Sequence, residues 1–104
     1  MKLKFYPEKK LKREILQIIS QYLDVKKYQV FVFGSRVSGQ GNERSDIDIG
    51  IEGPRAIPIE IVGQIRESLK NLPTLYTIDV IDFKTASDDF QKVAKQHLEL
   101  LIND

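Results

Sequence analysis

The chain has 104 residues, enough for one compact domain and too few for a second independent core. Apolar residues make up 41% of the sequence and charged residues 30%, a balance that is typical of soluble globular proteins and excludes a disordered chain. Sixteen Lys and Arg against fifteen Asp and Glu leave a net charge of +1, which argues against nucleic-acid partners and membrane surfaces.

The first half of the chain predicts a helix, a strand and a loop. Pro7 precedes a helix over 8–23, and 28–33 is β-branched and aromatic, as in a strand covered on both faces. Residues 34–45 hold three glycines and small polar residues, which predicts a loop with one short helical turn after Gly34. The helix carries one broad apolar face, made of Leu11, Ile15, Leu16, Ile18, Ile19, Tyr22 and Leu23.

The second half predicts a strand, a helix, a strand and a final helix. Residues 46–52 alternate strictly between polar and apolar, as in a strand with one buried face. A helix follows over 58–72, a third strand over 76–83, and a last helix that Asp88 caps and that runs through Leu101. These elements predict one domain over residues 1–104, of the α/β (α+β) class, with a small mixed sheet and helices packed on one face.

The most informative motif joins the loop after the first strand to the start of the second. Gly34-Ser35 ends an apolar strand, and after ten intervening residues Asp46-Ile47-Asp48 opens the next one. Two residues apart on a strand, Asp46 and Asp48 point to the same side, where their like charges raise one pKa unless a cation intervenes. Hard carboxylate oxygens suit magnesium or manganese, and Gly34 with Ser35 can approach a phosphate closely.

A third acid lies on the third strand. Asp79 is flanked by Ile78, Val80 and Ile81, and an acid in an apolar strand is costly unless a cation or partner compensates it. Asp82 has the opposite parity, so we expect it to point away from Asp79.

Other kinds of site are excluded or disfavoured. The chain has no cysteine and one histidine, His97, which excludes thiolate chemistry and a multi-histidine zinc site. His97 is expected on the last helix in a packing or surface role. No export signal or membrane span is recognisable, so a cytoplasmic location is expected.

These residues resemble the DNA polymerase β-like nucleotidyltransferases. The Gly34-Ser35-Arg36 opening and Arg44-Ser45-Asp46-Ile47-Asp48 look most like the minimal nucleotidyltransferases, often called MntA-type. The resemblance covers about 29–101 and implies the polymerase β-like nucleotidyltransferase fold.

The resemblance also implies an activity and its cofactors. Asp46, Asp48 and Asp79 would be the catalytic acids and would hold two Mg²⁺ or Mn²⁺ ions. The expected reaction is transfer of AMP from ATP to a hydroxyl, at the α-phosphorus.

The remaining site residues and the partner follow from the same resemblance. Gly34 and Ser35 would bind the triphosphate, and Arg36 or Arg44 would neutralise the leaving pyrophosphate. The expected acceptor is a tyrosine of a HEPN-domain toxin, for which this chain would be the adenylylating antitoxin.

Other interpretations of the same residues stay open. Asp46 and Asp48 could be a solvated strand edge, and the chain could be a non-catalytic antitoxin that blocks its partner by contact. A transferase acting on a small molecule ranks last, because the chain lacks a second domain to hold one. Surplus apolar residues on the first and last helices, among them Leu16 and Leu100, fit either core burial or an interface with a partner or a second copy.

Overall fold

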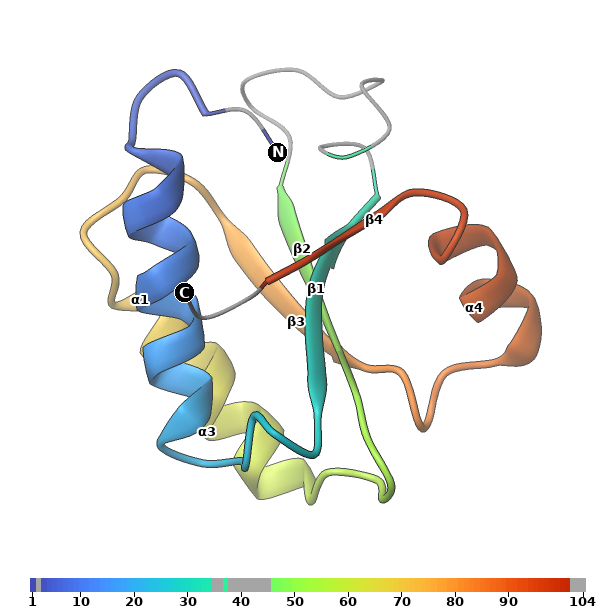
Figure 1. Cartoon of the computed structure of the whole chain (residues 1–104). Coiled ribbons are helices and arrows are strands. Elements are labelled where there is room, and N and C mark those ends of the chain that lie inside the picture. Colours follow the sequence, from blue (N-terminus) through green and yellow to red (C-terminus); the bar gives the residue numbers. More distant parts are fainter. Residues whose placement is uncertain (2, 35–36, 38–45, 102–104) are drawn as a thin grey trace.

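The computed structural model describes residues 1, 3–34, 37 and 46–101, and within them a four-stranded sheet and three helices (Figure 1). The elements are, in chain order, α1 (Glu8–Ser20), β1 (Gln29–Phe33), β2 (Ile47–Glu52), α3 (Ile59–Lys70), β3 (Ile78–Asp82), α4 (Asp88–Ala94) and β4 (Leu98–Leu100). None of the described helices combines the length and the apolar character that crossing a bilayer requires.

The sheet is mixed, as the sequence predicts. Its strand order is β3-β2-β1-β4, with β1 antiparallel to both β2 and β4. β2 and β3 are parallel, and α3 is part of the crossover between them. The sheet therefore places β3 directly beside β2, although residues 53–77 separate the two strands in the sequence.

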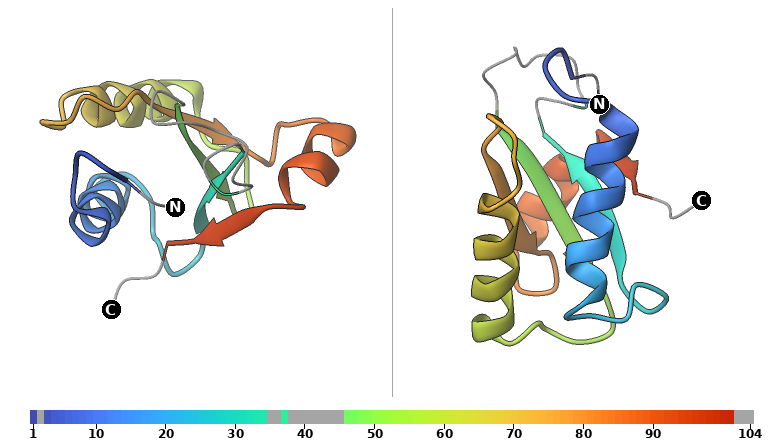
Figure 2. Two further views of the ribbon diagram at one scale, coloured as in Figure 1. Left: turned by 90° about the horizontal axis from the view of Figure 1, so that it is seen from above. Right: turned by 90° about the vertical axis from the view of Figure 1, so that its left-hand side faces the viewer.

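Two helices cover one face of the sheet. The views in Figure 2 show α1 and α3 together on one side, as predicted, and α4 on the other side. The alternating isoleucines Ile47, Ile49 and Ile51 of β2 are fully buried in the core beneath α1 and α3. Leu16, on α1, belongs to the same core, so ordinary burial accounts for it.

The opposite face carries an aromatic cluster. The ring of Phe83 lies 4.8 Å from that of Phe31 and 5.1 Å from that of Phe33, both edge to face. Phe90 of α4 packs against the same rings, at 5.6 Å from Phe83. Gly50 lies under this cluster, and a Cβ there would come within 2.3 Å of the Phe31 ring. The glycine in β2 thus makes room for the aromatic side chains.

The expected last helix is wrong in its second half. The helix α4 ends at Ala94, and the chain turns and adds the short strand β4 against β1. Pairing β1 on its second side satisfies backbone groups that would otherwise form an open edge. The helix cap is Ser87, whose side chain accepts a hydrogen bond from the Phe90 amide, and not Asp88. Leu100 is 45% exposed on the new strand.

Smaller differences concern element ends. The helix α1 stops at Ser20, three residues before the predicted end, and the amides of Tyr22 and Leu23 both turn back to the carbonyl of Ile19. The hydroxyl of Tyr22 contacts that of Ser68 on α3 at 3.1 Å. Tyr22 therefore packs between the two helices from a turn rather than from the helix itself.

The packing around Gly50 gives a stability prediction. Replacing Gly50 by alanine should lower the free energy of unfolding by about 1–3 kcal/mol, because Phe31 and Phe83 must move to admit the methyl group. The control is Gly63→Ala on α3, where a Cβ meets nothing within 4 Å. That change should stabilise the chain by about 0.5–1 kcal/mol, since alanine favours the helix. Urea unfolding measures both, and equal effects of the two variants would contradict this packing.

Candidate active site

Asp48 and Asp79 face each other across two neighbouring strands. They are register partners in the parallel pair of β2 and β3. The residues on either side of each are buried in the core under α1 and α3, so both carboxylates point to the opposite face. Asp46 immediately precedes β2 and is exposed. The structure therefore brings the acid of the third strand to the same side of the sheet as Asp48.

The charges of Asp46 and Asp79 act on Asp48. Partial burial raises the pKa of Asp48, and the negative charges of Asp46 and Asp79 raise that pKa further. The spacing of Asp46 and Asp48 in the sequence predicts the contribution of like charge to this raised pKa, and not the contribution of burial. The ionised Asp48 carboxylate is therefore destabilised by neighbouring negative charge, and a bound cation would stabilise it.

The backbone of Gly34 lies close to the carboxylate of Asp48. It directly follows β1 and has a φ of 85°, in the left-handed region that disfavours other residues. A Cβ on Gly34 would lie 2.9 Å from Oδ2 of Asp48. The Val37 amide donates to the Gly34 carbonyl at 3.1 Å. Gly34 is needed both for its backbone conformation and for its closeness to Asp48.

Asp79 has a partner that the sequence does not reveal. Arg66 of α3 donates from Nε to Oδ1 of Asp79 at 3.0 Å and from Nη2 to the Val80 carbonyl at 2.9 Å. The Val80 amide donates to the same Oδ1 at 2.8 Å. Sequence reasoning missed Arg66, because it looks like any exposed residue on the polar side of a helix.

Asp82 has a structural role, on the opposite side of β3. It is buried, and its Oδ2 accepts a hydrogen bond from the Ile57 amide at 2.8 Å. Its Oδ1 accepts one from the Lys84 amide at 3.0 Å. As the parity of the strand predicts, Asp82 points away from Asp79 and joins two loops instead.

Three predicted site residues, Ser35, Arg36 and Arg44, lie outside the described residues. His97 is exposed in the turn between α4 and β4, not on a helix as expected. It lies outside the group of acids described above.

The donor set suits a divalent cation. Carboxylate oxygens are the ligands that Mg²⁺ and Mn²⁺ prefer, and the pKa of Asp48 is raised first by its partial burial and then by the negative charges of Asp46 and Asp79. Within the described ranges, no three acidic, histidine or cysteine side chains already stand in a cage that could hold a metal. Asp46, Asp48 and Asp79 thus have the right chemistry, and binding would have to draw them together.

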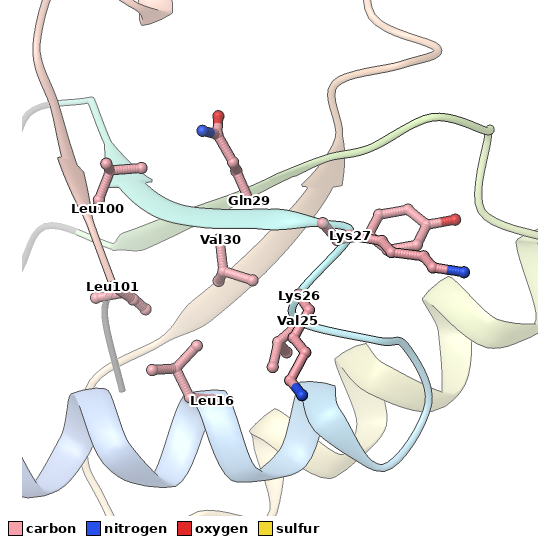
Figure 3. A pocket seen from close by; sticks show the side chains of 9 residues that line it. Leu16, Val25, Lys26, Lys27, Gln29, Val30, Leu100 and Leu101 are labelled. Carbon is pink, nitrogen blue, oxygen red and sulfur yellow. The ribbon is translucent and has the colours of Figure 1, made fainter. Parts of the chain in front are cut away.

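A separate hollow lies at the start of β1, beside Gln29 and Val30 (Figure 3). It has a volume of about 270 Å³ and is bounded by Leu16, Val30, Leu101 and the side chains of Val25 and Lys26. Asp48 pairs with Phe33 at the opposite end of this strand. The hollow is therefore not part of the group of acids.

The comparison with protein families gives one match over most of the chain. The family described as "Polymerase beta, Nucleotidyltransferase" matches residues 11–104. A relative from Haemophilus influenzae, the "Probable protein adenylyltransferase MntA", is 28% identical over 88 residues, which cover 83% of this chain and 77% of that protein.

Solved structures show the same fold. A chain of a toxin–antitoxin complex with AMP-PNP has a TM-score of 0.73 at 18% identity, covering 89% of this chain and 73% of that one. A chain of the complex between the tri-AMPylated HEPN toxin of Shewanella oneidensis and its MNT antitoxin also has a TM-score of 0.73, at 15% identity, covering 94% of this chain and 74% of that one.

The raised pKa of Asp48 gives a prediction about stability and pH. Because its folded pKa lies above the unfolded value of about 4, ionising Asp48 destabilises the fold, and this cost grows as the pH rises through that window. Asp48→Asn should therefore raise the melting temperature of the ligand-free chain at about pH 7, and this gain should vanish near pH 3. Thermal unfolding across the pH range measures it.

The control for this prediction is Glu67→Gln, on the exposed side of α3. It should change the melting temperature little at either pH. A lower melting temperature for Asp48→Asn than for wild type at neutral pH would contradict the electrostatic account.

Proposed function

Because the chain belongs to the polymerase beta nucleotidyltransferase family, we propose that it is a metal-dependent protein adenylyltransferase. It transfers AMP from ATP to a tyrosine hydroxyl of a HEPN-type toxin and acts as the antitoxin of that pair. The name of the Haemophilus influenzae relative supports the adenylyl transfer. The similar complexes, one with AMP-PNP and one with an AMPylated HEPN toxin, support the nucleotide and the partner.

The observation that carries the proposal is the pairing of Asp48 with Asp79. Their strands are parallel and in register, and both carboxylates face the side of the sheet away from α1 and α3. The charge of Asp46 reaches Asp48 as well. A protein that only binds its partner has no need for two acids in register on neighbouring strands with a third acid close enough to affect one of them.

The proposed reaction breaks one bond and forms one. The acceptor oxygen attacks the α-phosphorus, the bond to the β-phosphate breaks, and pyrophosphate leaves. The proton of the hydroxyl passes to a carboxylate or to solvent, so the charges balance. Mg²⁺ or Mn²⁺, two ions in this proposal, would supply positive charge beside the entering and leaving oxygens.

The chain's own residues divide this work by position. Asp46 and Asp48 would hold the cation that accompanies the triphosphate, and Asp79 would join them on the side of the acceptor. The Gly34 backbone, close to Asp48, holds the triphosphate. In this proposal Ser35 assists at the phosphates, and Arg36 or Arg44 neutralises the pyrophosphate.

The acids provide the test. Asp46→Asn combined with Asp48→Asn should reduce magnesium-dependent transfer of α-labelled ATP onto the co-purified HEPN-type partner by more than about 100-fold, because the cation loses two ligands. The label on the partner is measured by autoradiography and by mass spectrometry of the modified tyrosine. Asp88→Asn with Asp89→Asn is the matched control, since it removes two exposed charges from the first turn of α4.

Two results would contradict the proposal. Label transfer that survives the loss of Asp46 and Asp48 would show that the chemistry lies elsewhere. A partner that the double variant neutralises as well as wild type, without any label, would favour the non-catalytic antitoxin that acts by contact.

A further inference from the structure

Arg66 reaches its acid from the far side of the sheet. The helix α3 packs on the face that holds the side chains of Ile78 and Val80, whereas Asp79 points to the opposite face. β3 is the outer strand of the sheet beside β2. The guanidinium therefore has to pass around the outer edge of β3 to donate to Oδ1 of Asp79 at 3.0 Å.

The contact fixes the guanidinium and the carboxylate together. Nη2 of Arg66 donates to the Val80 carbonyl at 2.9 Å, so two nitrogens of one planar group have separate acceptors. Oδ1 of Asp79 in turn receives both Arg66 and the Val80 amide, the latter at 2.8 Å. One carboxylate oxygen is thus held by a backbone donor and by a side chain from another element.

The second carboxylate oxygen of Asp79, Oδ2, is not used by these hydrogen bonds. Among the described residues, no hydrogen-bond donor reaches Oδ2. A carboxylate that is fixed through one oxygen presents the other in a defined direction, as the outer partners of metal ligands do. The side chains of Arg66 and Asp79 are 44% and 48% exposed, and ion pairs at such exposure contribute little to stability. The contact is therefore better suited to positioning than to holding the fold together.

We propose that Arg66 is a positioning residue that holds Oδ1 of Asp79 at the edge of β3 and leaves Oδ2 free to bind the divalent cation. This inference rests on the proposed function for its catalytic consequence. Its effect on cation binding can be measured without nucleotide or partner.

The test compares Arg66→Met with Arg66→Lys in the full chain. Methionine keeps an unbranched apolar side chain without donors, and lysine keeps the charge but lacks the planar fork that serves two acceptors. Lys70→Met, one turn further along α3 and exposed, is the control for the loss of a positive charge on this helix. Mn²⁺ binding is followed by electron paramagnetic resonance of the free ion, and thermal unfolding reports the fold of each variant.

Arg66→Met should weaken Mn²⁺ binding about 10-fold, and Arg66→Lys by less, because the carboxylate loses its fixed orientation. With ATP and the HEPN-type partner, kcat should fall about 10-fold while the KM for ATP stays within about 3-fold, since Asp46 and Asp48 would still hold the cation that accompanies the triphosphate. Lys70→Met should match wild type in all of these measurements. Should Arg66→Met fail to fold, Arg66→Lys, which retains the charge, carries the comparison.

Several results would overturn the inference. If Mn²⁺ binding is unchanged in the Arg66 variants, Arg66 only stabilises the edge of β3, whatever the melting temperatures show. Tighter binding would show that Arg66 competes with the cation, and a wild-type chain that binds no Mn²⁺ would remove Asp79 from any cation site. A wild type that binds Mn²⁺ but transfers no label would instead contradict the proposed function, while the Mn²⁺ comparison still decides the role of Arg66.

Discussion

The register of two parallel strands determines the candidate site. β2 and β3 pair so that Asp48 lies opposite Asp79, and a shift by one residue would send one of the two carboxylates into the core. The buried isoleucine positions of β2 and the apolar neighbours of Asp79 prevent this shift, because they fill the space under α1 and α3. The hydrophobic core thus determines where the charges meet, and it does so at a cost that appears in the raised pKa of Asp48.

The face of the sheet away from α1 and α3 has two distinct regions. At one end of β2, Gly50 admits the rings of Phe31 and Phe83, and α4 covers this cluster with Phe90. Two residues earlier on the same strand, Asp48 begins the acidic region, with the backbone of Gly34 close to its carboxylate. Aromatic packing and acidic side chains therefore share one surface, and the two glycines let other groups approach β2 closely.

Alternation along the strands was enough to predict much of this arrangement. It predicted that Asp48 points away from Ile47, Ile49 and Ile51 and that Asp82 points away from Asp79, because side chains on a strand alternate regardless of their partners. That Asp79 shares the side of Asp48 depends on how β3 pairs with β2, which alternation within one strand does not determine. It did not predict β4, since three residues that pair with β1 are too short to show a strand period and continue the apolar spacing of α4. Nor could it predict Arg66, whose contact with Asp79 depends on how α3 lies against the edge of β3. The assignments of Ser35, Arg36 and Arg44 remain predictions from the motif.

The most direct test of this account is a crystal structure of the chain with Mn²⁺ and a non-hydrolysable ATP analogue, in which anomalous scattering locates the cation. The account predicts anomalous density between Asp46 and Asp48, next to the triphosphate, with Oδ2 of Asp79 turned towards it and Oδ1 still bound by Arg66. Density at another place on the chain, or a nucleotide bound with Asp79 turned away from the other two acids, would contradict it.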